Sequence, residues 1–430
     1  MRAGIRMIDL VRGTDILKKY DELVALGNQG SLSGISVDKR IADLLIALKE
    51  HNTFYKPLLK KYSSVQIIEN PLEVLNSMPI MDKQVINDNY RDIFTPIEGR
   101  KTQKKKTGGS TGNPFYYYVD KEHLSWFWAY IYFFWNRYSG YNPGDPFITI
   151  AGNSLRTNNR RIAEKAYHKL QQNYFIKGDI IDAEIVINYS KTNKAVLLYG
   201  YPSSIMNLLK VKPELVNHVR KLRAIFTTSE QLTPNTRNFI ENALQVPVFD
   251  MYGANDGGIL TCECPQHDGY HINIHNCFVE TFQNEFGMSE LLLTNLNSYS
   301  FPLVRYRVGD LGKTVGKSCS CGLNWPKITE LKGRTRDLIK LPDGKSVHGS
   351  FFNNVLYKYP IIDGYRIVQQ KDLSLILYLH LQDPDKYEEI SKKIVDEIHV
   401  SFNSLIVITK FMSDMNPTND KFKLIESHAI

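Results

Sequence analysis

The stretch that decides the fold is Thr107-Gly108-Gly109-Ser110-Thr111-Gly112-Asn113-Pro114. Its glycines permit tight backbone turns that aim successive N–H groups at one point, and its hydroxyl side chains add hydrogen-bond donors without bulk. Lysines occupy residues 104–106, directly before it. The pattern indicates a loop that holds the phosphates of a nucleotide, although a run of glycine, serine and threonine also suits an ordinary surface loop.

This stretch differs from the P-loop of nucleotide triphosphatases. A P-loop has a lysine directly after its last glycine, and then a serine or threonine. Here Asn113 and Pro114 follow Gly112. The missing lysine excludes a P-loop kinase.

Length and composition are those of a globular protein with more than one domain. The chain has 430 residues, 43% of them hydrophobic and 23% charged, which is enough for two or three domains. Its formal net charge of +8 suits anionic small molecules and is too small to indicate nucleic acid. The basic clusters at residues 100–106 and 156–161 suit either loops near phosphate or solvated faces.

No segment is predicted to enter a membrane. Residues 1–10 alternate charged and apolar side chains, so no signal sequence is visible there. The most apolar run, residues 124–135 (LSWFWAYIYFFW), is too short to span a bilayer. We expect a cytoplasmic protein in which this run forms a buried helix whose aromatic rings fill the core or line an apolar pocket.

Helix and strand patterns alternate after the glycine-rich stretch, which predicts an α/β fold. Strands are expected at 183–187, 195–199, 222–227 and 246–250, and helices at 39–50, 161–171, 204–210 and 234–244. Ligands of open α/β sheets bind beyond the carboxyl ends of strands, so the residues after Thr227 and Asp250 should line a site. The pattern changes near Gly333, and strands at 374–381 and 405–411 with a helix at 384–400 predict a small α+β domain.

Further segments follow in the order that one enzyme family requires. They are Asp250–Asp256 (DMYGAND), Arg305–Leu311 (RYRVGDL), Lys332–Lys340 (KGRTRDLIK) and Asn416–Ile425 (NPTNDKFKLI). With the glycine-rich stretch they resemble the signatures of the adenylate-forming, acyl-CoA synthetase-like enzymes, over residues 107–421. Residues 228–232 (TSEQL) and the turn at 341–345 (LPDGK) are similar to the phenylacetate–CoA ligase and CapK-like branch.

The resemblance implies a fold and an activity. The fold would be a large domain of mixed and parallel sheets flanked by helices (1–333) and a small, mobile α+β lid (334–430). The activity would be ATP-dependent conversion of a carboxylic acid to an acyl-adenylate, with Mg²⁺. Transfer of the acyl group would follow, either to the thiol of coenzyme A or to an amine, such as an amino sugar in the polysaccharide biosynthesis associated with CapK-like relatives. Neither the acid nor the oligomeric state is indicated.

The resemblance also implies nucleotide-binding residues. The glycine-rich stretch would bind phosphates through Thr107, Gly108, Gly109, Ser110, Thr111 and Gly112. Tyr252 would stack on adenine, with Ser229, Glu230 and Gly253 beside it, and Asp310 would accept the ribose hydroxyls. Asp256 would bind Mg²⁺ next to Asn255, at positions where the family has glutamate and threonine.

The remaining catalytic positions follow from the carboxyl-terminal motifs. Arg334 would reach the ribose or phosphate, and Arg336 would be the hinge of the lid. Lys421 matches the catalytic lysine, with Lys423 as the competing choice, and either lysine also suits a solvated surface. Asp420 replaces the family's glycine. Together with Asn255 and Asp256, this substitution leaves open a catalytically silent nucleotide-binding or scaffold protein.

The cysteines predict a second, structural metal site. Four of the five form the pairs Cys262-x-Cys264 and Cys319-x-Cys321, and in a chain with no visible secretion signal such pairs favour zinc over disulfides. We expect zinc ligands at Cys264, His267, Cys319 and Cys321. Cys262 is the alternative to His267, and His271 and His275 are more distant alternatives. The alternative interpretation is that these cysteines are reduced thiols that bind no metal. Cys277 is expected to be an ordinary core residue.

Overall fold

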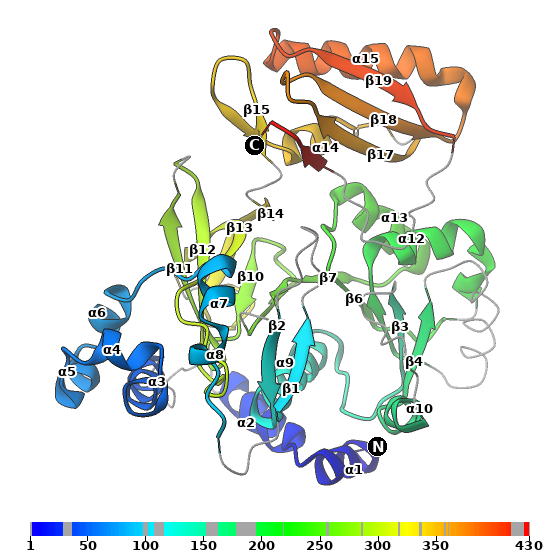
Figure 1. Cartoon of the computed structure of the whole chain (residues 1–430). Coiled ribbons are helices and arrows are strands. Elements are labelled where there is room, and N and C mark those ends of the chain that lie inside the picture. The colour runs from blue at the N-terminus through cyan, green and yellow to red at the C-terminus, as the bar shows by residue number, and fades with distance from the viewer. Residues whose placement is uncertain are drawn as a thin grey trace. The chain divides into compact units, whose positions relative to one another are not determined.

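The computed structural model (Figure 1) describes residues 2–28, 37–97, 102–106, 116–151, 162–177, 195–217, 219–254, 258–284, 287–316, 319–334, 338–356, 358–359, 361–413 and 425–429. The chain divides into two compact units. The large unit comprises Met1–Thr281, Leu291–Val308 and Lys313–Thr329, and the small unit comprises Phe282–Glu290, Gly309–Gly312 and Glu330–Ile430. The small unit thus includes two short segments that the sequence assigned to the large domain, and its main segment begins just before the expected boundary at 333.

One part of the large unit is a parallel sheet (Figure 1). Its strand order is β4 (Asn173–Lys177), β3 (Phe147–Ala151), β5 (Leu197–Gly200), β6 (Ala224–Thr228) and β7 (Val248–Met251). Every residue of β6 and β7 is buried, as expected for strands of a parallel sheet that is covered on both faces. The strands expected at 195–199, 222–227 and 246–250 are confirmed within two residues, whereas the strand expected at 183–187 lies outside the described residues.

Side chains that alternate along these strands pack against different helices. Ile148, Leu198 and Ile225 share one core with helices α12 (Pro202–Val211) and α13 (Pro234–Leu244). Residues of opposite parity meet helix α9 (Lys121–Ser139), in which the Trp135 ring lies 4.9 Å from that of Phe147 and 6.0 Å from that of Phe226. Since successive side chains of a strand point to opposite faces, α12 and α13 cover one face of the sheet and α9 covers the other.

Helix α9 contains the aromatic run of residues 124–135, and most of that run is buried. Asp120 caps its N-terminus by accepting a hydrogen bond from the His123 amide (3.0 Å), and Gly140 ends it in the left-handed conformation, with a φ of 65°. The run is a core helix, as predicted. Among the helices in the described ranges, none is both long and apolar enough to cross a membrane.

A second sheet has the strand order β11 (Cys277–Gln283), β12 (Ser289–Asn295), β13 (Tyr306–Val315), β14 (Lys327–Arg334), β10 (Tyr270–Ile272), β9 (Ile259–Glu263) and β8 (Gly253–Ala254). Strand β9 pairs antiparallel with both β8 and β10, and β10 pairs antiparallel with β14. The chain thus passes from the last parallel strand, β7, through β8 directly into an antiparallel sheet.

Helices make up most of the first hundred residues. They are α1 (Ala3–Arg12), α2 (Ile16–Asn28), α3 (Val37–His51), α4 (Tyr55–Leu59), α5 (Ser64–Glu69), α6 (Pro71–Asn76), α7 (Lys83–Asp88) and α8 (Tyr90–Ile93). Buried Leu44, Tyr55 and Leu75 share a core with Leu296 and Val304, which anchors α3, α4 and α6 to the chain on either side of residue 300. Strands β1 (Thr102–Lys106) and β2 (Tyr116–Asp120) then pair antiparallel, and α10 (Ile162–Leu170) lies between β3 and β4.

The main segment of the small unit has the α+β composition that the sequence predicts. A hairpin of β15 (Leu338–Lys340) and β16 (Ser346–His348) precedes α14 (Ser350–Leu356). The following sheet has the order β19 (Val407–Phe411), β18 (Leu375–Leu381), β17 (Ile362–Gln369) and β20 (Ile425–Ser427). Helix α15 (Tyr387–Ser401) buries Ile390, Ile394 and Ile398 in the core that these strands share. The predicted fold class, mixed α/β with a small α+β unit, is confirmed.

Candidate functional site

The residues of the glycine-rich stretch, Thr107 to Gly112, lie outside the described residues. Their flanking strands are described: β1 and β2 pair antiparallel with Lys106 opposite Tyr116. The Lys104 ammonium lies 4.4 Å from the centre of the Tyr116 ring, a cation–π contact within this pair. The segment before the stretch is therefore fixed to the segment after it.

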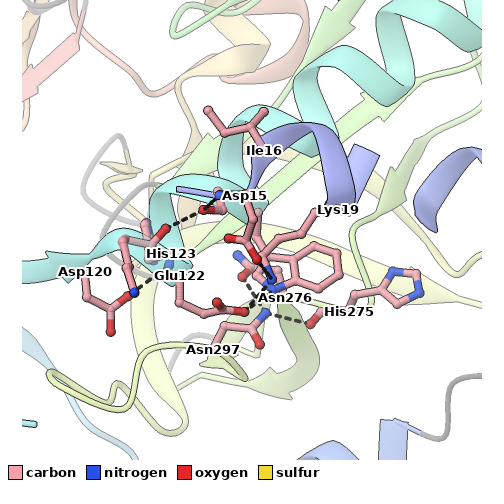
Figure 2. Close-up of polar contacts among 12 residues, drawn as sticks. Asp15, Ile16, Lys19, Asp120, Glu122, His123, His275, Asn276 and Asn297 are labelled. Carbon is pink, nitrogen blue, oxygen red and sulfur yellow. Dashed lines mark hydrogen bonds and ion pairs between the residues drawn. The ribbon is translucent and has the colours of Figure 1, made fainter. Parts of the chain in front are cut away.

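Strand β2 leads directly into the start of α9, which polar contacts hold in place (Figure 2). Glu122 accepts hydrogen bonds from the Lys19 ammonium (2.7 Å) and from the Trp126 indole (2.9 Å). The Ser125 hydroxyl accepts one from the Asp15 amide (3.1 Å). Since Lys19 and Asp15 belong to α2 and the turn before it, the helix α2 fixes the position at which the chain leaves β2.

The predicted adenine-binding residues follow two neighbouring strands of the parallel sheet. Thr228 of β6 pairs with Met251 of β7, so Ser229–Glu230 and Tyr252–Gly253 leave the sheet side by side. This placement is the one expected from the rule that ligands bind at the carboxyl ends of parallel strands.

Backbone contacts hold both of these segments in defined conformations. Ser229 has a positive φ of 69°, which is uncommon for a residue other than glycine. Glu230 accepts a hydrogen bond from the Ser203 amide (3.2 Å) in the first turn of α12. The Tyr252 carbonyl accepts two from Thr261 of β9, from its amide (2.8 Å) and its hydroxyl (3.0 Å). Tyr252 is half-buried and Gly253 is exposed.

A buried acid, to which the motifs assign no role, lies in β7 two residues before Tyr252. Asp250 accepts hydrogen bonds from the hydroxyls of Thr227 (2.6 Å) and Tyr270 (2.8 Å), and its amide donates to Glu263 (3.1 Å). Burial raises the pKa of Asp250 to about 7. Arg237 also donates to Glu263, so this network joins β7, β9, β10 and α13. The signal in the sequence is an acid within an otherwise apolar strand (VFDM).

Gly258 comes directly before β9, has a backbone conformation that other residues rarely adopt, and lies close to the Asn295 side chain. It has a φ of 70°, and a Cβ built on it would lie 2.1 Å from the Asn295 amide nitrogen. That nitrogen donates to His123 of α9 (3.3 Å), and the Gly258 carbonyl accepts from Asn273 and Asn276. This glycine therefore lets β9 approach the segment that supports α9.

The other predicted nucleotide-site residues fall into two groups. Asp310 lies half-buried in β13, after Gly309, which has a φ of 85°. Arg334 ends β14. Asn255, Asp256, Arg336, Asp420, Lys421 and Lys423 lie outside the described residues.

Three of the four predicted zinc ligands come together, and the fourth does not join them. The ligand atoms of Cys264, His271, Cys319 and Cys321 all lie within 4.8 Å of one another. His267, predicted as the fourth ligand, has a φ of 49°, and its Nδ1 lies 3.2 Å from the Glu263 carboxylate. The turn at His267 thus directs its ring to the Glu263 network.

The register of the β9–β10 hairpin explains why His271, and not His267, lies with the three cysteines. Strand β10 returns antiparallel to β9, with His271 opposite Cys262 and Tyr270 opposite Glu263. The ring of His271 is fully buried, and its Nε2 lies 3.3 Å from Cys321 Sγ. Cys262, the predicted alternate, is buried in β9 and is not part of this group of four. Spacing along the chain favoured His267, whereas the pairing of the two strands would have identified His271.

Comparison with known proteins gives relatives over most of the chain, although no family model matches. Protein CapK of Staphylococcus aureus is 24% identical over 398 residues, which are 90% of this chain and 86% of CapK. A phenylacetate-coenzyme A ligase of Thermus thermophilus is 22% identical over 381 residues, 84% of each protein.

Solved structures share the fold. A 2-hydroxyisobutyryl-CoA ligase in the postadenylation state, bound to an acyl-AMP, superposes with a TM-score of 0.72 at 17% identity, covering 91% of this chain and 89% of the ligase. An anthranilate CoA ligase in complex with anthranoyl-AMP gives a TM-score of 0.52 at 14% identity, covering 73% of this chain and 63% of that one.

Proposed function

We propose that this chain, which by its relatives and its fold belongs with the adenylate-forming ligases of the phenylacetate–CoA ligase and CapK-like branch, activates a carboxylic acid with ATP. The observation that carries the proposal is the pairing of Thr228 with Met251. It puts the two expected adenine-binding segments side by side at the carboxyl edge of a parallel sheet.

The described residues at this edge suit a purine. Tyr252 offers a flat ring that is not fully buried, and the exposed Gly253 has no side chain to cover the space next to it. A Cβ at Gly253 would make only ordinary van der Waals contacts, the nearest at 3.4 Å from the Ile259 carbonyl oxygen, so this exposed position is not tightly packed. An aromatic face beside an open backbone is a suitable surface for a base to stack on.

The proposed reaction has two steps. In the first, a carboxylate oxygen attacks the α-phosphorus of ATP, the bond to the bridging oxygen breaks, and pyrophosphate leaves. In the second, a nucleophile attacks the acyl carbon of the adenylate, and AMP leaves. Holding both reactants in line and neutralising charge on the phosphate oxygens are the protein's contributions to the first step.

The remaining motif residues have proposed roles in that step. The hydroxyls and amides of Thr107 to Gly112 bind the departing phosphates, Asp310 accepts the ribose hydroxyls, and Arg334 and Lys421 supply positive charge. Asp256 is the proposed protein ligand of Mg²⁺, which when bound would neutralise phosphate charge. Rotation of residues 334–430 about Arg336 would follow the first step and would prepare the site for the second step.

Coenzyme A is the proposed acceptor, since the second relative is named as a coenzyme A ligase. An amine, such as that of an amino sugar, is the other candidate acceptor, as the resemblance of the motifs to the CapK-like branch implies. The two differ in the second step alone, because a thiolate and an amine attack the same acyl carbon.

Pyrophosphate release from ATP, measured over a panel of carboxylic acids with and without coenzyme A, tests the proposal. We expect release that depends on the acid, and with the correct acceptor we expect continued turnover with AMP as a product. ATP binding without acid-dependent release of pyrophosphate from any acid would instead support a catalytically silent nucleotide-binding protein.

Two matched pairs of variants locate the activity. Tyr252→Ala should raise the KM for ATP by roughly 10-fold or more, because stacking of a base on an aromatic ring contributes ~1–3 kcal/mol. Tyr252→Phe keeps the ring and should keep the KM for ATP.

Lys421→Ala should lower the rate of pyrophosphate release by about 100-fold or more, since one charge-stabilising donor commonly contributes that much, whereas Lys423→Ala should leave the rate unchanged. Equal losses in the two lysine variants would contradict the assignment of Lys421.

A further inference from the structure

We infer that Cys264, His271, Cys319 and Cys321 bind a zinc ion that has a structural role, a site beyond the proposed function and built from different residues. Cys264 directly follows β9, His271 lies in β10, and the two other cysteines lie in the turn before β14. All of them belong to the large unit. Histidine and cysteine are the ligands that zinc prefers in structural sites.

Two of the distances between these ligand atoms match those around a tetrahedral zinc ion, and all of the atoms lie within 4.8 Å of one another. With zinc about 2.3 Å from sulfur and about 2.0 Å from nitrogen, two sulfurs stand about 3.8 Å apart, and a sulfur and a nitrogen about 3.5 Å apart. Cys264 Sγ lies 3.8 Å from Cys319 Sγ, and Cys321 Sγ lies 3.3 Å from His271 Nε2. A disulfide would instead need sulfurs about 2.05 Å apart.

The orientation of His271 is the one that a metal ligand needs. Its Nδ1 lies 3.3 Å from the Trp325 carbonyl, which can only accept, so Nδ1 carries the proton. The lone pair is therefore on Nε2, the atom that faces the cysteines. Metal-bound histidines are commonly held in this way by a carbonyl on the second nitrogen.

Neighbouring donors compensate the charge of a three-thiolate site. Three thiolates, a neutral imidazole and Zn²⁺ together carry one negative charge. The Lys327 ammonium, whose side chain is 6% exposed, lies 3.8 Å from Cys319 Sγ and 2.7 Å from the Asp268 carboxylate. The Leu323 amide donates to Cys321 Sγ (3.4 Å). With an ion bound, this ammonium and this amide would help to offset the negative charge on the sulfurs.

Four protein ligands leave no open position, so the ion would be structural and not catalytic. It would join the β9–β10 hairpin to the turn at 319–321. The next consequence rests on the proposed function: Thr261 of β9 holds the Tyr252 carbonyl, so loss of the ion should loosen the Tyr252 segment and raise the KM for ATP.

Metal analysis of the purified full chain is the primary test. We expect a single zinc ion per chain, measured by mass spectrometry of the metal and retained through gel filtration without added zinc. Reconstitution with Co²⁺ should give the intense absorption of a tetrahedral, thiolate-bound ion. Folded protein that contains no zinc and takes up neither metal would overturn the inference.

Paired variants test the ligand set. His271→Ala and Cys319→Ser should lose zinc, whereas His267→Ala and Cys277→Ser should retain it, since neither of the latter residues belongs to the group of four. Zinc retained in folded His271→Ala but lost in His267→Ala would overturn the assigned ligand. If His271→Ala fails to fold, the cobalt spectrum of the unsubstituted protein still decides whether thiolates bind the metal. Zinc content is read without any acid substrate, so a failed pyrophosphate assay leaves this result unaffected.

Discussion

Asp250 is a residue whose charge is set by its surroundings more than by the motif that contains it. It is buried in β7, two residues before Tyr252, and hydroxyls of Thr227 and Tyr270 donate to its carboxylate. Burial raises its pKa to about 7, against about 3.9 for an exposed aspartate. Between about pH 4 and pH 7, therefore, the folded chain holds a proton that the unfolded chain has lost.

This difference predicts how stability changes with pH. A folded-state pKa above the unfolded value contributes stability that is fully present below about pH 4 and is lost as pH rises through about 7. Asp250→Asn cannot titrate, so between pH 5 and 7 the wild-type chain should lose stability relative to this variant by at most ~1.4 kcal/mol per pH unit. Thermal unfolding of both proteins over that range measures the difference. A constant difference in unfolding temperature would mean that Asp250 does not titrate there.

At the scale of elements, the start of α9 depends on Asp120. This buried side chain accepts from the His123 amide at the helix N-terminus and from the Ser300 hydroxyl (3.3 Å). It also ends β2, the strand that follows the glycine-rich stretch. One carboxylate thus determines both where a strand stops and where the core helix starts.

Replacing that carboxylate should destabilise the protein in a graded way. Asp120→Ala removes the cap and should lower the free energy of unfolding by about 0.5–2 kcal/mol, whereas Asp120→Asn keeps an oxygen that can accept and should cost less. Denaturant unfolding of the two variants gives the comparison. The same loss in both would show that negative charge, and not capping, is what Asp120 provides.

At the scale of the whole molecule, the two units have separate cores. Ile394 of α15 is fully buried with strands of the small unit, and Ile225 of β6 is fully buried in the parallel sheet of the large unit. A substitution in one core should therefore destabilise mainly the unit that contains that core.

A cavity in one core should be felt mainly in that unit. Ile394→Ala should cost about 2–5 kcal/mol, as large-to-small changes in cores do. Hydrogen exchange should then accelerate in β17 and β18, while β5 and β6 keep their protection. Equal acceleration in both sets of strands would show that the units unfold together.

The sequence was sufficient for those features that depend on local pattern. The α/β order, the core helix around Trp135 and the edge of the sheet after Thr227 and Asp250 all follow from runs of apolar residues and their neighbours. The position of His271 did not follow, because strand pairing brings it to Cys264 and the spacing along the chain does not reveal the register. Asp250 was missed because the sequence does not show how deeply an acid at a strand end is buried.

Gly258 has a consequence for how this protein can evolve. Any heritable replacement would push a side chain into Asn295, and the amide of Asn295 could then no longer reach His123. The glycine is constrained twice, by the Asn295 side chain and by its own φ of 70°, which strains other residues whatever the space around them. In a collection of orthologues, we therefore expect glycine to be kept at position 258 even where position 295 has become smaller.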